Sequence, residues 1–220
     1  ARIVERESVW ARGQRVTAVV LPAGGEVTAV REVLPTLYER FDERYRKYVV
    51  ERMYASGVNA ELGEQLREEA SFSLTLPNVY RHWTEDGPVH AFVNDQSGRS
   101  QLIRAIAVTW REGTEAPSVE EALAWRDGLM EPTYGMRHLS QPEPLRTAAL
   151  EGRAEGSVEI RGGWDGTDED GFPIAGPFLT RVIVCPEQDR TYLMDAWLYA
   201  PGEAKREYML QLETIFDTFE

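Results

Sequence analysis

FLTRVIVCPEQDRTYLMDAWLY, residues 178–199, is the stretch that decides the fold. It contains two runs rich in β-branched and aromatic residues, 178–185 and 191–199, separated by the short polar turn 186–189. This arrangement is typical of two antiparallel strands joined by a turn. Another β-rich run, 156–161, precedes them. We therefore predict a three-stranded meander in the last third of the chain.

Two further strand patterns lie upstream of the meander. Apolar and polar residues alternate over 71–76, which predicts a half-buried strand, and Pro77 closes the run. Residues 89–93 and 102–110 flank the turn 94–98 and predict an antiparallel hairpin. The sheet is therefore expected to be mainly antiparallel.

Four segments carry helical signals. Apolar residues recur at three- and four-residue steps from Val30 onward, and Pro35 should kink this helix or open a second segment. Ser118 and Glu121 form a capping box for a helix that Pro132 should end. The remaining helices are expected over 60–70, capped by Asn59, and over 203–218.

The order of these elements predicts an α+β fold. Strands joined by short turns, with helices packed on their faces, make an α/β/α sandwich around an antiparallel sheet, which we expect over 71–220. Residues 139–153 are expected to be a connection. Residues 1–70 comprise a strand at 16–21 and the long helix, and we expect them to be the remnant of a larger N-terminal region or to pack on one.

An aromatic stripe follows one face of the long helix. Its members are Tyr38, Phe41, Tyr45 and Tyr48. Such a stripe serves either as a ligand groove or as core packing. We expect core packing against a sheet.

The charge of the chain is acidic and unevenly placed. The sequence holds 37 acidic and 24 basic residues, a net charge of −13, and 22 of the 24 bases are Arg. Residues 1–60 have a net charge of +2 and residues 61–220 a net charge of −15. A negative field repels a polyanion, so we expect no nucleic-acid partner. The acidic excess has three interpretations: a solvated face, a partner surface, or adaptation to salt. We expect solvent adaptation, of the halophilic kind, rather than a binding surface.

Residues for catalysis are sparse. The three histidines, His82, His90 and His138, form no metal-binding spacing, and no nucleophile elbow or phosphate-binding loop occurs. His82 follows a strand and has Glu85 and Asp86 nearby in sequence, so it could act as a general acid or base. A surface aromatic cluster is the competing interpretation. The single thiol, that of Cys185, ends an apolar strand pattern, and we expect it to be packing.

The loop 164–171 concentrates four carboxylates, with Asp165, Asp168 and Asp170 as candidate metal ligands. Calcium favours such oxygen clusters, but an EF-hand loop aligned on Gly171 would have Gly166 at its first position and Pro177 at its twelfth. An irregular, weak cation site and a solvated hairpin loop remain as alternatives. No cofactor is expected.

Several short motifs occur in order along the chain. They are Val9-Trp10-Ala11, Arg161-Gly162-Gly163-Trp164, Gly176-Pro177-Phe178, Tyr199-Ala200-Pro201 and the helical segment 205–213. Together they resemble the uncharacterised bacterial family catalogued as domain of unknown function 4837. The resemblance covers most of the chain and is strongest over about the last sixty residues. The chain departs from the family in the loop 165–173, which is longer and more acidic.

The order of elements is also similar to another group. A strand ending in Leu76-Pro77, a helix after Ser118, a meander and a last helix ending at 214–219 resemble the PsbP-type α/β/α sandwich. Such sandwiches are common among non-enzymatic lipoproteins. This resemblance concerns the fold only.

The family resemblance implies an envelope protein on the periplasmic side, attached to the membrane only through an N-terminal anchor absent from this chain. It brings no catalytic residue. We expect a non-catalytic domain that binds an unknown envelope protein or a small ligand. The alternative is a hydrolase or other enzyme with its site near His82 or the loop 165–170. A pocket with a histidine or carboxylate of shifted pKa would favour the enzyme, and an exposed apolar patch would favour a partner.

Overall fold

A computed structural model describes residues 1–84, 89–95, 101–168 and 171–220 of the chain. The chain divides into two compact units, Ala1–Val49 and Val50–Glu220. The division falls within helix α1 (Glu26–Met53), earlier than the boundary at residue 70 that we expected from the sequence. None of the helices in the described residues is both long and apolar enough to cross a membrane.

The first unit contains a two-stranded antiparallel sheet and most of α1. Strand β2 (Arg15–Val20) lies where the sequence predicts a strand, whereas its partner β1 (Arg2–Glu7) was not predicted. The carboxylate of Glu5 accepts a hydrogen bond from Arg44 and lies 3.5 Å from Arg40, so it ties β1 to α1. Pro35 lies inside α1 and does not divide it.

The aromatic stripe of α1 is not core. The side chains of Tyr38, Phe41 and Tyr48 are 65%, 52% and 51% exposed, so the prediction of packing against a sheet is wrong for them. The first unit has a sheet of only two strands, and this sheet offers too little surface to cover a helix face of such length.

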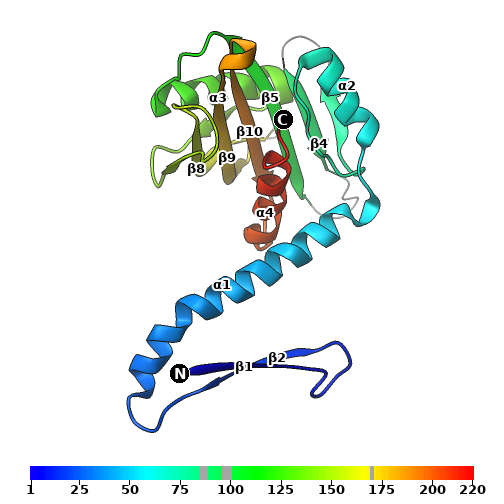
Figure 1. Cartoon of the computed structure of the whole chain (residues 1–220). Helices are drawn as coiled ribbons and strands as arrows, with labels where there is room; N and C mark the ends of the chain where they lie inside the picture. The colour runs from blue at the N-terminus through cyan, green and yellow to red at the C-terminus, as the bar shows by residue number, and fades with distance from the viewer. Residues whose placement is uncertain (85–88, 96–100, 169–170) are drawn as a thin grey trace. The chain divides into compact units, whose positions relative to one another are not determined.

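The second unit is built on an antiparallel sheet with the strand order β3-β4-β5-β10-β9-β8-β6, and β7 also pairs with β8 (Figure 1). The predicted hairpin and meander are both confirmed, although β8 and β9 are longer than expected. The turn residues 96–98 of the predicted hairpin lie outside the described residues. The strands are β3 (Arg81–Thr84), β4 (His90–Asn94), β5 (Ile103–Glu112), β6 (His138–Ser140), β7 (Arg146–Ala149), β8 (Val158–Thr167), β9 (Pro173–Cys185) and β10 (Arg190–Tyr199).

Helices cover both faces of this sheet, as expected for an α/β/α sandwich (Figure 1). Helix α3 (Val119–Tyr134) packs on one face, while α2 (Ala60–Ala70) and α4 (Lys205–Phe216) pack on the other. Two short 3-10 helices, Tyr54–Ser56 and Pro186–Gln188, complete the elements of the described residues.

The helix ends follow local chemistry. The capping box at Ser118 and the cap at Asn59 are both confirmed. The prediction that Pro132 ends α3 is wrong, because the helix continues to Tyr134 and stops at Gly135, whose φ of 70° is left-handed. Gly135 donates its N–H to a helix carbonyl, and this left-handed cap ends the helix instead.

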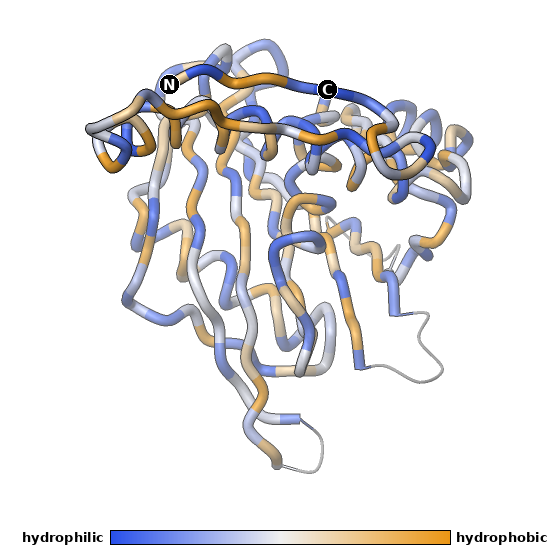
Figure 2. Tube along the Cα trace, turned by 90° about the horizontal axis from the view of Figure 1, so that it is seen from below, coloured by the Kyte–Doolittle hydropathy of each residue, from blue (hydrophilic) through white to orange (hydrophobic). Residues whose placement is uncertain are grey.

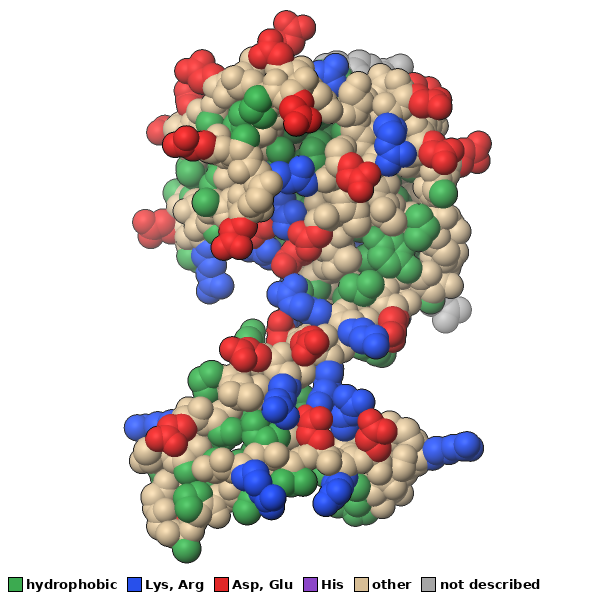
Figure 3. Space-filling model, viewed as in Figure 1, with side chains coloured by type: hydrophobic (Ala, Val, Ile, Leu, Met, Phe, Trp, Pro, Cys, Tyr) green, Lys and Arg blue, Asp and Glu red, His purple; other side chains and the backbone are tan. Residues whose placement is uncertain are grey.

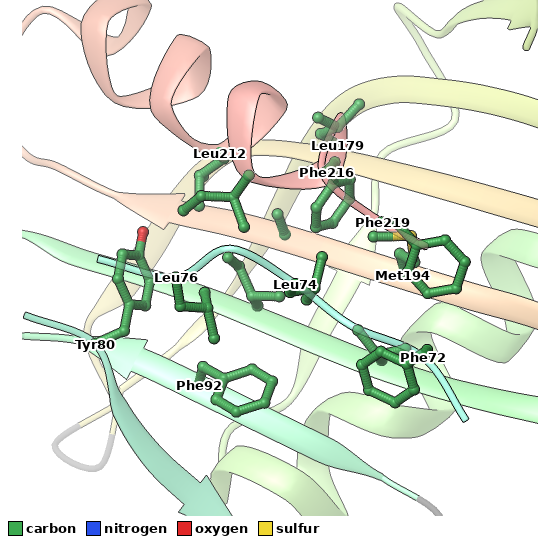
Figure 4. Packing of buried hydrophobic residues seen from close by; sticks show 14 of the residues in the cluster. Phe72, Leu74, Leu76, Tyr80, Phe92, Leu179, Met194, Leu212, Phe216 and Phe219 are labelled. Carbon is green, nitrogen blue, oxygen red and sulfur yellow. The ribbon is translucent and has the colours of Figure 1, made fainter. Parts of the chain in front are cut away.

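The segment 71–76 is extended but is not a strand of the sheet, which corrects the sequence prediction. Ser73 and Glu220 exchange both backbone hydrogen bonds, at 3.0 and 3.3 Å, and the N–H of Thr75 donates to Oγ1 of Thr218 at 2.9 Å. The segment therefore pairs with the chain end and lies over the sheet. Its buried apolar side chains, which Figure 4 shows in the core beside α4, are Phe72, Leu74 and Leu76.

The expected connection 139–153 contains two short strands instead, β6 and β7. Both pair with β8, whose full length from Val158 to Thr167 offers two successive stretches of edge. The strands have no clear sequence signal, since they are only three and four residues long and follow the edge of a neighbour.

Short hydrophobic and hydrophilic stretches succeed one another along the strands in Figure 2, as expected for alternating side chains. On the face shown in Figure 3, acidic side chains are spread over the second unit rather than gathered in one place.

Candidate functional site

A pocket of about 320 Å³ lies on the α3 face of the sheet. Its walls include His138 of β6, Trp164 of β8, and Trp197 and Tyr199 of β10. Side chains two residues apart on a strand share a face, so β10 places both of its aromatic rings here. Asp168 also lines this pocket, which we call the aromatic pocket.

Three rings form the inner wall of the aromatic pocket. The imidazole of His138 stacks on Trp164 with 3.8 Å between ring centroids and an interplanar angle of 10°. Trp197 meets both rings edge-on, at 4.7 Å from His138 and 5.6 Å from Trp164. All three side chains are at most 1% exposed. The wall is therefore closely packed.

Glycine at position 176 makes this wall possible. A Cβ atom at Gly176 would lie 1.8 Å from the carbonyl oxygen of Leu198 and 3.0 Å from Nε1 of Trp164. No other residue fits so close to the neighbouring backbone. The glycine in the motif Gly176-Pro177-Phe178 thus lets β9 and β10 hold the indole of Trp164 against the sheet.

The inner wall has unused hydrogen-bonding groups. Among the described residues, no partner is present for either ring nitrogen of His138 or for Nε1 of Trp164 and Trp197. Buried polar groups in folded proteins are normally paired with protein or water. Four such atoms therefore lie in the residues that line one cavity.

A buried charge network lies next to the wall. Arg126 of α3 donates from Nε to Oδ1 of Asp195 at 3.0 Å, and both side chains are 0% exposed. Oγ1 of Thr180 donates to the same oxygen at 2.6 Å. Arg126 also donates to Asp127 at 2.9 Å, and the carboxylate of Asp127 accepts from the backbone and hydroxyl of Ser140 in β6. The network thus fixes β6, and with it His138, to α3.

Burial and neighbouring charges shift the pKa values of His138 and Asp195. Burial, assisted by the positive charge of Arg126 and opposed by Asp127, lowers the pKa of His138 to about 4. The imidazole is therefore neutral near pH 7 and offers one donor and one acceptor. Burial also raises the pKa of Asp195, although Arg126 and Thr180 oppose this shift.

The residues predicted from sequence lie in different places. His82 is on β3 and stacks on Phe92, on the face opposite the aromatic pocket, while Glu85 and Asp86 are outside the described residues. Cys185 is half-buried at the end of β9 and packs against the core.

The candidate metal ligands Asp165 and Asp168 belong to no metal-binding cluster within the described ranges. Asp165 is exposed within β8, and Asp168 lines the aromatic pocket and accepts from the backbone of Phe172 at 2.8 Å. Asp170 lies outside the described residues. Within the described ranges, no three His, Cys, Asp or Glu side chains are grouped to hold a metal ion.

The site residue that sequence reasoning missed is His138. It directly precedes the segment 139–153 that we expected to be a connection, and its partners Trp164 and Trp197 are far away in sequence. One signal in the sequence was the run Arg161-Gly162-Gly163-Trp164 in β8. Its two glycines leave room for side chains of the neighbouring segments.

The fold and the pocket define an α+β sandwich domain with a cavity lined by aromatic side chains. The chain belongs to the family described as Domain of unknown function (DUF4837), whose model matches residues 59–218. The resemblance noted from the short motifs is therefore confirmed. A comparison with curated proteins finds no significant match.

Solved structures with a similar arrangement include the Saccharomyces cerevisiae Ran-binding protein Mog1p, with a TM-score of 0.44 and 11% identity over 68% of this chain and 89% of that chain. Cyanobacterial PsbP from Synechocystis sp. PCC 6803 has a TM-score of 0.43 and 11% identity over 68% of this chain and 85% of that chain. The expected PsbP-type protein is thus among the structural neighbours. The fold class itself rests on the sheet order and layers described above.

Proposed function

We propose that the protein is a non-catalytic binding domain whose aromatic pocket takes a small, neutral aromatic molecule with an amide-like polar group. The observation that carries this proposal is the set of unpartnered nitrogens on His138, Trp164 and Trp197 beside a cavity of about 320 Å³. Ligand pockets of this size are typically apolar with a few polar groups that orient the ligand. The carboxylate of Asp168 disfavours an anionic ligand.

The lowered pKa of His138 also bears on the alternative that the protein is an enzyme. A convergent pocket with such a residue is one sign of a catalytic site. However, general-base catalysis near neutral pH needs a pKa close to 7, and that of His138 is lowered to about 4. The hydroxyl of Ser140 already donates to Asp127 at 2.7 Å. These two observations favour binding over hydrolysis.

Benzamide is the probe that tests this function, because it combines an aromatic ring with one donor and one acceptor group. We expect saturable quenching of tryptophan fluorescence by benzamide, with toluene and benzoate binding more weakly. Trp197→Phe keeps an aromatic ring and removes one N–H, so it should weaken benzamide binding roughly fivefold.

The matched control is Trp110→Phe, which changes a tryptophan on the opposite face and should leave the affinity unchanged. The proposal fails if benzamide does not bind saturably, or if both variants bind it as the wild type does.

We also propose that the protein works on the periplasmic side of the cell envelope. The support is the family to which it belongs, whose members resemble envelope lipoproteins. Fractionation of cells that express the full-length native gene should recover the protein with envelope markers. Recovery of most of it with cytoplasmic markers would contradict this location.

A further inference from the structure

A second pocket, of about 560 Å³, lies on the opposite face of the sheet, beside α4. Its polar wall is formed by Tyr80, by Asn94 of β4 and Arg104 of β5, and by Tyr208 and Gln211 of α4. We call it the α4 pocket. In Figure 4 the ring of Tyr80 stands at the edge of the core with its hydroxyl directed toward α4.

Strand register brings the two sheet residues of this wall together. Asn94 and Arg104 are directly opposite each other in the antiparallel β4–β5 pair, and residues two positions away, Phe92 and Ile106, belong to the core on the α4 face. Alternation along each strand therefore points Asn94 and Arg104 to the same face. Tyr80 reaches that face from the segment before β3.

Three atoms of this wall are buried, and no partner for them is present in the described part of the chain. They are the hydroxyl of Tyr80, Nδ2 of Asn94 and Nε of Arg104. Tyr80 and Asn94 are only 4% and 3% exposed. Each of these atoms is a hydrogen-bond donor, so the residues of this wall hold three donors that no described residue satisfies.

The wall of the α4 pocket also carries a positive charge, that of Arg104. Arg104 donates from one terminal nitrogen to Oε1 of Gln211 at 2.6 Å and lies 5.5 Å above the ring of Tyr208. Within the described ranges, no carboxylate lies at salt-bridge distance from its guanidinium. Glu207, which also lines the pocket, lies 3.5 Å from Arg52. Arg104 is thus a half-buried arginine without a carboxylate partner among the residues that the structure describes.

Besides Arg52, Ser56 and Glu207, the rest of the lining of the α4 pocket is apolar. Met53, Val79 and Leu102 contribute to the lining. A ligand that fits both parts carries an acceptor-rich anionic group at one end and a hydrocarbon body at the other. A carboxylate supplies two oxygens and about four lone-pair sites, which match a guanidinium N–H, an amide N–H and a phenol O–H.

We propose that the α4 pocket binds the carboxylate of a small organic acid with an apolar body. Arg104 and Asn94 hold the carboxylate, and Tyr80 donates a further hydrogen bond to it. This site is separate from the aromatic pocket, so the two proposals stand or fall independently.

Isothermal titration calorimetry on the whole chain tests the proposal, with hexanoate as the probe. We expect saturable binding of hexanoate, and at least about tenfold weaker binding of 1-hexanol and hexylamine, because these lack the anionic group. Inorganic phosphate that bound as tightly as hexanoate would overturn the assignment to an organic acid.

Two variants place the binding in this pocket. Tyr80→Phe keeps the buried ring and should weaken hexanoate binding roughly fivefold, while Arg104→Gln should weaken it more than about tenfold. Tyr134→Phe is the matched control, because it removes another buried hydroxyl without a partner among the described residues, on the α3 face. It should bind hexanoate as the wild type does. Unchanged affinity in a folded Tyr80→Phe, or no saturable binding by the wild type, would overturn the proposal.

Discussion

Replacement of Arg126 by methionine lowers the free energy of unfolding by about 3 to 5 kcal/mol, because it leaves the carboxylate of Asp195 buried without its cation. Both side chains are 0% exposed, and of the described residues only Thr180 would still donate a hydrogen bond to that carboxylate. Methionine fills a similar length of space against Phe178, so the loss comes mainly from the charge. Urea denaturation followed by tryptophan fluorescence measures it.

Two comparisons separate this effect from general damage. Arg81→Met breaks the exposed pair between Arg81 and Asp95, whose side chains are 47% and 36% exposed, and should cost less than about 1 kcal/mol. The double variant Arg126→Met/Asp195→Asn removes both charges and should be more stable than the sum of the single changes predicts, by about 2 kcal/mol or more. Strict additivity would show that the pair is not coupled.

Acidification destabilises the protein through His138. The unfolded imidazole binds a proton near the ordinary pKa of 6.5, but the folded one only near 4, so the unfolded state binds more protons between these values. The contribution of His138 to stability is therefore full above about pH 6.5 and is lost as the pH drops toward 4. The loss from His138 alone is about 2 kcal/mol between pH 7 and pH 5, and about 3 kcal/mol by pH 4.

The variant His138→Gln isolates this contribution. It removes the titrating ring, while all carboxylates titrate as before, so its stability should depend less steeply on pH than that of the wild type. Denaturation curves between about pH 7 and pH 5 give the two slopes. If the two profiles are parallel, His138 is not held neutral by the fold. A titration of the ring by NMR checks the lowered pKa independently.

Local patterns in the sequence predicted much of the sandwich. The runs at 178–185 and 191–199 became β9 and β10 because β-branched and aromatic residues suit a sheet buried on both faces. The caps at Asn59 and Ser118 were correct because their hydrogen bonds reach only three residues along the chain. Such interactions are complete within a short segment, so a single sequence reveals them.

Segments that depend on distant partners were predicted less well. Alternation over 71–76 indicated a strand, but its backbone found Glu220 and Thr218 at the chain end instead of a neighbour in the sheet. Strand β6 has only three residues and exists because β8 offers an edge. The aromatic stripe of α1 matched a core pattern, yet the small sheet of its unit leaves Tyr38 exposed.

The prediction of site residues shows the same division between local signals and contacts of distant segments. Sequence reasoning chose His82 and the acidic loop because each stood out locally, and of these only Asp168 lines the aromatic pocket. The unpartnered nitrogens of His138 and Trp197 come from strands about sixty residues apart. No spacing rule links them, because their contact depends on the position of β6 and β10 in the sheet order.

By itself, the sequence determined the α+β class, the antiparallel meander, the helix caps and the family of this protein. These follow from alternation, helical periodicity and short motifs, all of which act between near neighbours. Only the tertiary structure decided which faces are covered, where His138 lies, and which polar atoms remain without partners in the described residues. Burial and hydrogen-bond pairing are properties of residues brought together from distant parts of the chain, so they appear only when the sheet is assembled.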